Sequence, residues 1–149
     1  MSQIKPTKAF RISAIASLLI GAGAYLIGLY NAEMLLNEKG YYLAILLYSL
    51  FSVVSLQKSV RDKLDDLPIS KPYIMICWSS VALAIALLTI GLINADLLLS
   101  EKGFFAMAYT LAIFAAITVQ KNVRDMMQLN QNNQDVETDP VIEDSVNLL

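Results

Sequence analysis

Two carboxylates that recur at the same place in a repeated segment are the residues of this chain best suited to chemistry. Glu33 follows Asn31 by two residues, and Asp96 follows Asn94 in the same way. Carboxylate and amide oxygens suit hard cations, so these four side chains, packed together, would form a cation-binding outer vestibule. The alternative is that they terminate helices in the headgroup region of a lipid bilayer, where water solvates the side chains. We favour this second interpretation.

These residues belong to a segment that the chain carries twice. The decapeptide 31–40 (NAEMLLNEKG) returns as 94–103 (NADLLLSEKG), with every residue number raised by 63. Between 26–62 and 89–125, 16 of 37 aligned positions are identical. The glycine that ends each decapeptide favours a tight reversal, because glycine tolerates positive φ. We therefore expect each decapeptide to connect two helices.

Polar and charged residues end both copies in the same order. They are Gln57, Lys58, Arg61 and Asp62 in the first copy and Gln120, Lys121, Arg124 and Asp125 in the second. On a helix, Lys58 and Asp62 have the spacing of an i,i+4 ion pair. Cations at a helix C-terminus are favourable and also reach anionic headgroups. We interpret both segments as anchors at the cytoplasmic boundary, with docking of a partner protein as the alternative.

The composition excludes several kinds of active site. The chain has no histidine, which removes histidine acid–base catalysis and histidine metal ligands. Its one cysteine, Cys77, has no partner for an intrachain disulfide or a cysteine cluster. We predict no catalytic residue, no cofactor, no metal and no enzyme. Nucleic-acid binding is not supported either, because the basic clusters are short and lie beside apolar runs.

Four apolar runs make up most of the chain, which is 56% hydrophobic. They cover 12–30, 41–56, 73–93 and 104–119, and they contain no Asp, Glu, Lys or Arg. Because about 20 helical residues cross the bilayer core, the first and third runs can span it unaided, and flanking residues complete the others. The predicted fold class is an all-α membrane protein with four transmembrane helices in two tandem hairpins of the same orientation.

Runs and charges together divide the chain into segments. We expect a cytoplasmic N-terminus at 1–11, two-helix repeats at 12–62 and 73–125, a cytoplasmic linker at 63–72 and an acidic, disordered cytoplasmic tail at 126–149. Nine Lys and Arg residues lie on the side of the termini and the linker, against Lys39 and Lys102 on the other side. The positive-inside rule then predicts that both termini are cytoplasmic.

Small residues spaced by four mark helix faces suited to close packing. They are Ser13, Ser17 and Gly21 in the first run and Ala108, Ala112 and Ala116 in the fourth. In lipid, such stripes let helices approach closely. They serve either packing within one chain or a homodimer, and the sequence leaves both open.

Both copies resemble a known family. Segment 31–42 (NAEMLLNEKGYY) and segment 57–62 (QKSVRD), with their counterparts within 94–125, are similar to the YiaA/YiaB two-helix family of bacterial inner-membrane proteins. The resemblance covers nearly all of 10–125 and implies a multi-pass protein of the bacterial inner membrane. It implies no catalytic residue, substrate or cofactor.

Two functions remain open. The first is a non-enzymatic protein that acts by helix packing as a scaffold, accessory subunit or envelope-associated factor. The second is a small oligomeric transporter or channel with Glu33 and Asp96 at an outer vestibule. Proton-coupled transport generally depends on a carboxylate within the membrane, and the apolar runs contain none. The expected partners are the lipid bilayer and either a second copy or another membrane protein.

Overall fold

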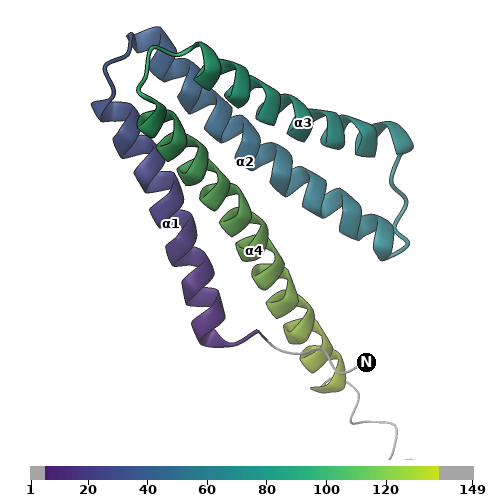
Figure 1. Cartoon of the computed structure of the whole chain (residues 1–149). Coiled ribbons are helices and arrows are strands. Elements are labelled where there is room, and N and C mark those ends of the chain that lie inside the picture. Colours follow the sequence, from purple (N-terminus) through teal and green to yellow (C-terminus); the bar gives the residue numbers. More distant parts are fainter. Residues whose placement is uncertain (1–5, 138–149) are drawn as a thin grey trace, which may run out of the picture.

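Four helices joined by short connections make up the computed structural model (Figure 1), which describes residues 6–137. The helices are α1 (Lys8–Asn31), α2 (Leu36–Leu64), α3 (Lys71–Asn94) and α4 (Leu99–Glu137). Each contains a stretch that is long and apolar enough to cross a membrane. The 24 residues of α1 rise by about 36 Å, more than the ~30 Å of a bilayer core. The prediction of an all-α membrane protein with four such helices is confirmed.

Local sequence explains where these helices begin and end. The side-chain oxygen of Thr7 accepts a hydrogen bond from the amide of Phe10 at 3.3 Å and so caps α1. After α2, Asp66 takes a φ of 54°, a left-handed conformation that aspartate adopts more readily than most residues. Ser70 precedes α3, and Pro72 lies in its first turn, where a missing amide proton costs little.

The closest helix packing is between the two repeats rather than within them. Helix α1 packs along α4 and α2 packs along α3, followed by a smaller contact between α2 and α4. Figure 1 shows both pairs meeting at the end that carries the two short connections and diverging toward the opposite end. Each hairpin is thus opened, and its helices pack on those of the other hairpin. Equivalent helices hold equivalent places, as expected for same-orientation repeats related by an axis along the membrane normal.

Burial follows the repeat beyond the segment in which the two sequences match. The buried residues are Ala14, Gly21, Tyr25 and Leu29 in α1 and Cys77, Ala84, Leu88 and Leu92 in α3. Each member of the first set lies 63 positions before a member of the second. Sequence identity reveals this register only from 26 and 89 onward. The repeat therefore includes most of α1 and α3.

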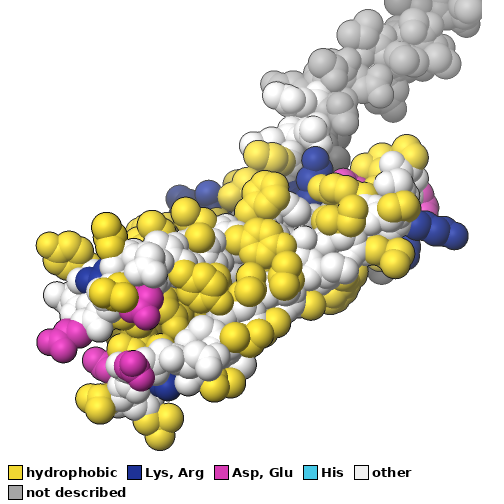
Figure 2. All heavy atoms as spheres, turned by 90° about the horizontal axis from the view of Figure 1, so that it is seen from above, with side chains coloured by type: hydrophobic (Ala, Val, Ile, Leu, Met, Phe, Trp, Pro, Cys, Tyr) yellow, Lys and Arg dark blue, Asp and Glu magenta, His cyan; other side chains and the backbone are white. Residues whose placement is uncertain are grey.

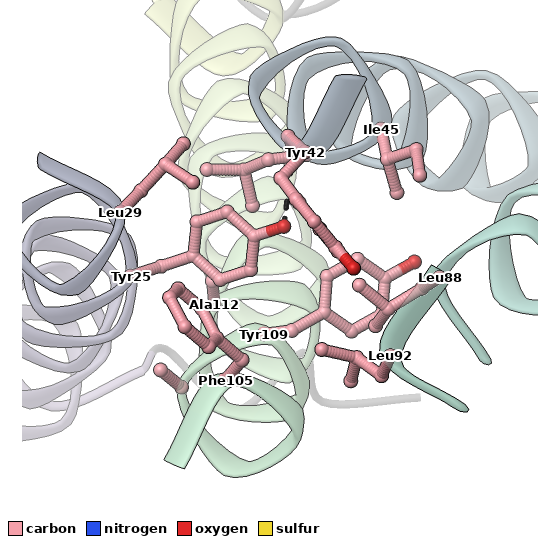
Figure 3. Close-up of a cluster of buried hydrophobic side chains, with 11 residues drawn as sticks. Tyr25, Leu29, Tyr42, Ile45, Leu88, Leu92, Phe105, Tyr109 and Ala112 are labelled. Carbon is pink, nitrogen blue, oxygen red and sulfur yellow. Dashed lines mark hydrogen bonds between the residues drawn. The ribbon is translucent and has the colours of Figure 1, made fainter. Parts of the chain in front are cut away.

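An aromatic cluster between the two helix pairs forms the core (Figure 3). Tyr25 of α1, Tyr42 of α2 and Phe105 of α4 are all buried. The ring of Tyr25 stands edge-on to that of Phe105, with centroids 5.4 Å apart, as the quadrupoles of aromatic rings favour. Leu29 and Leu92 pack around these rings. The core thus joins all four helices at the end where the pairs meet.

Two buried hydroxyl groups connect the α1–α4 pair to α2. Tyr25 donates a hydrogen bond to the carbonyl oxygen of Tyr42 at 3.0 Å. Tyr109 donates to the hydroxyl oxygen of Ser49 at 2.6 Å, and Ser49 in turn donates to the carbonyl oxygen of Ile45 at 2.6 Å. Both donor rings come from the α1–α4 pair, and all acceptors are on α2. These bonds hold the two pairs together near the core.

Small residues let α1 and α4 approach closely. A Cβ atom on Gly21 would lie 2.7 Å from the amide nitrogen of Ala112 and 3.1 Å from the carbonyl oxygen of Ala108. Ala108, Ala112 and Ala116 are all buried, whereas Ser13 is exposed. The α4 stripe therefore packs within the chain, which settles for this stripe the choice that the sequence left open.

The predicted reversal at the repeated glycines is wrong. Gly40 lies inside α2 and Gly103 inside α4, and no described glycine has a positive φ. The chain reverses instead at 32–35 and 95–98. The reason is that Glu38 and Glu101 cap their helices at the amides of Leu35 and Leu98, so each helix begins before its glycine.

Part of the predicted disordered tail is also helical. Helix α4 continues through 126–137, and the remaining residues, 138–149, lie outside the described part of the chain, as do 1–5. Extending an existing helix adds one hydrogen bond per residue without a new nucleation cost. The methionine, glutamine and leucine residues at 126–129 are good helix formers.

Charged side chains gather toward the two ends of the molecule. Figure 2 shows a group of acidic side chains at one end, a broad apolar surface along the length, and Lys and Arg side chains with a few acidic ones toward the other end. The exposed apolar surface includes Leu19, Phe51 and Phe114, each more than 60% exposed. Such a surface suits a lipid environment, where apolar side chains need no cover.

Candidate functional site

The repeated asparagines close the C-terminal ends of α1 and α3. The amide nitrogen of the Asn31 side chain donates to the carbonyl oxygen of Ile27 at 2.8 Å, and that of Asn94 donates to Ile90 at 2.7 Å. Each bond ties the asparagine at the end of its helix to a carbonyl oxygen one turn earlier. The helix-terminating interpretation therefore describes what the amide groups of both asparagines do.

The repeated Glu–Lys pair completes a clamp around each connection. The Glu38 carboxylate accepts from the amide of Leu35 at 2.8 Å, at the start of α2. The Lys39 ammonium donates to the carbonyl oxygen of Tyr30 at 2.8 Å, at the end of α1. In the second copy, Glu101 and Lys102 make the equivalent bonds at 2.8 and 3.1 Å. The decapeptide is thus a helix–connection–helix clamp, which explains why its polar residues recur.

Glu33 and Asp96 take no part in this clamp. Both side chains are exposed, and within residues 6–137 neither forms an ion pair or a hydrogen bond. Their carboxylates are therefore available to an external partner.

A cleft between α2 and α3 brings the two carboxylates together. This acidic cleft has a volume of about 900 Å³ and is lined by Glu33, Asn37, Glu38, Tyr41, Gly91, Asn94, Asp96 and their neighbours. It contains three of the four predicted vestibule residues, from both connections. Among the described residues, no group of three or more His, Cys, Asp or Glu side chains is arranged to hold a metal ion. The exposed carboxylates of Glu33 and Asp96 make the cleft suited to attracting cationic groups.

Asn31 does not line the acidic cleft. It lines a smaller cleft of about 300 Å³ between α1 and α4, together with Ser100, Glu101, Phe104 and their neighbours. Each of these positions is offset by 63 from one in the acidic cleft. The four predicted residues therefore do not line one cleft: Asn31 lies on the α1–α4 side, and the other three line the cleft between α2 and α3.

Glycine and aromatic residues shape the two clefts, and the sequence analysis did not assign them to the site. A Cβ atom on Gly91 would lie 2.8 Å from the ring of Tyr41, and one on Gly28 would lie 2.6 Å from the ring of Phe104. The Tyr41 hydroxyl also donates to the carbonyl oxygen of Leu87 at 2.8 Å. The glycine that recurs at positions 28 and 91 was the sequence signal for these contacts. Each aromatic ring approaches the neighbouring helix at the position where glycine has no side chain.

At the opposite end, the charged boundary segments contact each other across the repeats. Arg61 pairs with Asp65 at 3.2 Å and reaches Asp125 of α4 at 3.9 Å. The predicted Lys58–Asp62 ion pair is not formed, because an exposed lysine gains little from such a pair against the entropy of its side chain. Burial, and then the charge of Arg61, lowers the pKa of Arg124. The other members, Gln57, Gln120 and Lys121, are half-buried or exposed.

Comparison with known proteins agrees with this architecture. The family described as the yiaA/B two helix domain matches residues 10–62 and again residues 73–125. The chain is 52% identical to the inner membrane protein YiaA of Escherichia coli over 117 residues, which cover 78% of this chain and 81% of that protein. It is 32% identical to the inner membrane protein YiaB of the same organism, covering 67% and 87%.

Two further comparisons complete the picture. The uncharacterized membrane protein YubF of Bacillus subtilis is 41% identical over 61 residues, which are 40% of this chain and 70% of that protein. No solved structure matches. The two family matches coincide with the two helix–connection–helix units, each with its own decapeptide clamp. The chain is therefore a multi-pass membrane protein of the yiaA/B two-helix domain family, with two tandem copies of the domain.

Proposed function

We propose that this chain is a non-enzymatic scaffold or accessory subunit of the bacterial inner membrane, which recruits a partner through its acidic cleft. The observation that carries the proposal is that only some polar residues of the decapeptide take part in the clamp. Asn31, Glu38 and Lys39, like their counterparts, form the bonds of the clamp, whereas Glu33 and Asp96 are exposed and unpaired within the described residues. Two free carboxylates on one cleft favour docking of a cationic group.

Positive charge supports an orientation for this cleft. Nine of the eleven Lys and Arg residues fall on the side of the termini and the 63–72 linker. By the positive-inside rule, that side is cytoplasmic and the acidic cleft faces the periplasm. The partner we propose is a membrane protein with a basic periplasmic segment. Such an attraction weakens at high salt, since exposed charges are screened.

Transport is less well supported as an alternative. The four apolar runs contain no Asp, Glu, Lys or Arg. The buried hydroxyl groups of Tyr25, Ser49 and Tyr109 are already hydrogen-bonded inside the protein. An ion crossing the monomer would therefore meet no carboxylate, lysine or arginine along the four apolar runs. An oligomer with the acidic cleft at its mouth is the form that transport would require.

Crosslinking in native membranes tests the proposal. The tagged chain is crosslinked, solubilised in a mild detergent and its stoichiometric partners identified. We expect one membrane protein partner, lost when Glu33→Gln and Asp96→Asn are combined. Asp66→Asn, an exposed carboxylate at the opposite end, is the matched control and should retain it. A chain that yields no partner, or a partner indifferent to the double substitution, refutes docking at the cleft.

If crosslinking yields only a homo-oligomer of this chain, the result favours the transport alternative. In that case ion flux is measured in vesicles that contain the wild-type chain or the Glu33→Gln, Asp96→Asn chain. A loss of flux in the double variant would replace the scaffold with a transporter. Unchanged flux would remove both carboxylates from any transport mechanism.

A further inference from the structure

An apolar groove runs between α3 and the first half of α4, with α2 along its floor. Its volume is about 620 Å³, and its walls include Val81, Ile85 and Leu88 of α3 and Ala106 and Ile113 of α4. It begins at Lys102, at the end of the molecule that carries the short connections. It is separate from the acidic cleft, which lies between α2 and α3.

The two repeats differ in size at two positions beside this groove. Tyr25 of α1 donates its hydroxyl proton to the Tyr42 carbonyl and so bridges α1 and α2. Its counterpart in α3 is Leu88, which is smaller and cannot make this bond. Leu43 of α2 likewise corresponds to Ala106 of α4. At both positions the smaller side chain belongs to the second repeat and lines the groove.

The lining offers no free hydroxyl donors to a polar ligand. Thr89 and Thr110 donate to the carbonyl oxygens of Ile85 and Ala106, both at 2.8 Å. The Tyr109 hydroxyl is bonded to Ser49. Apart from Lys102 at its mouth, the groove therefore presents hydrocarbon and satisfied hydroxyl groups. Its occupant should be a hydrocarbon chain.

The length of the groove suits an acyl chain. From Lys102 to Ile113 the groove follows α4 for about 17 Å, close to half of the ~30 Å bilayer core. Ile85, Thr110 and Phe114 line the groove and are exposed, so it opens on the apolar surface of the molecule. The acyl chain of a lipid in one leaflet matches this length.

A cation marks the mouth of the groove. Lys102 donates one ammonium proton to the carbonyl oxygen of Ile93 at 3.1 Å, which leaves two protons for another acceptor. The adjacent Glu101 lines a different cleft, between α1 and α4, and its carboxylate is bonded to Leu98. We propose that the groove binds one acyl chain of an anionic phospholipid, whose phosphate contacts Lys102. The lipid comes from the leaflet on the side of the short connections.

Photolabelling of the reconstituted chain tests this assignment. Full-length protein in phosphatidylethanolamine–phosphatidylglycerol vesicles receives a trace of phosphatidylglycerol that carries a diazirine near the end of one acyl chain. Labelled residues are then located by peptide mass spectrometry. We expect label around Ile113 and Val81, at the deep end of the groove. Phosphatidylcholine with the same diazirine should label these residues about fivefold less, the factor for one lysine near an anionic headgroup.

Three variants separate the groove from general lipid contact. Ala106→Leu installs the residue of the first repeat and should lower labelling at Ile113 to the level of the exposed helix faces. Met107→Leu, at a neighbouring side chain that is 76% exposed, is the matched control and should keep the wild-type pattern. Lys102→Gln should retain the label and lose the preference for phosphatidylglycerol.

Several results would overturn the proposal. One is label spread evenly over the exposed faces of α3 and α4, and another is label that Ala106→Leu leaves unchanged. Disulfide-linked dimers of Thr110→Cys would show that a second copy occupies the groove instead. If Ala106→Leu loses its helical circular dichroism, Leu88→Tyr fills the same space from α3 and must give the same fall in labelling.

Discussion

Replacing Gly21 with alanine tests the close approach of α1 and α4. The new Cβ atom would lie 2.7 Å from the amide nitrogen of Ala112 and 3.1 Å from the carbonyl oxygen of Ala108. Both are backbone atoms, so no side chain can turn aside and α1 has to move away from α4. Overpacking of this kind costs about 1–3 kcal/mol. Gly23, two residues along the same helix, would place its Cβ atom in open space.

Comparing the two alanine variants isolates the contact. Both substitutions gain the same intrinsic helix propensity, about 1 kcal/mol in water, so this contribution cancels in the difference. We expect Gly21→Ala to be about 1–3 kcal/mol less stable than Gly23→Ala. Titration with sodium dodecyl sulfate in mixed micelles, followed by far-ultraviolet circular dichroism, gives both free energies of unfolding. Equal stability of the two variants would refute the close α1–α4 packing.

Two further predictions concern the core and the orientation. Tyr109→Phe removes the buried hydrogen bond to Ser49 and should lower the free energy of unfolding by about 0.5–1.5 kcal/mol in the same titration. The control is Tyr30→Phe, which should have no effect because the Tyr30 ring is 82% exposed. An equal loss of stability in both variants would contradict the role of the bond. In intact cells, a membrane-impermeant maleimide should label Glu33→Cys but reach Asp66→Cys only after permeabilisation, with little background from the buried Cys77. Labelling of both cysteines in intact cells would contradict the proposed topology.

The sequence was sufficient to predict the helices and the units they form. Runs without charge have the length of a bilayer crossing, and this depends on composition alone. The decapeptide identified both connections, although its glycines were assigned the wrong role. Two local preferences conflict in this segment: Gly40 favours a turn, whereas the Glu38 side chain caps a helix that begins before it. In the structure the helix forms, and Gly40 lies inside it.

The composition of the candidate site was predicted in part. Glu33, Asn94 and Asp96 do line one cleft, but Asn31 lines another. Sequence spacing shows which residues are equivalent but not which of them share a cleft: Glu33 and Asp96 do, whereas Asn31 and Asn94 do not. Which pair shares a cleft depends on which helices are neighbours. No local pattern contains that information.

By itself, the sequence determined the all-helical class, the four spans and the two repeats, because each follows from local composition or spacing. Only the tertiary structure decided that α1 pairs with α4 and α2 with α3. The physical reason is that these helices are apolar on every side, so hydrophobicity does not mark the buried face. Packing decides it instead, through contacts such as Gly21 against Ala112 and the bond from Tyr109 to Ser49. The acidic cleft and the apolar groove both follow from that pairing.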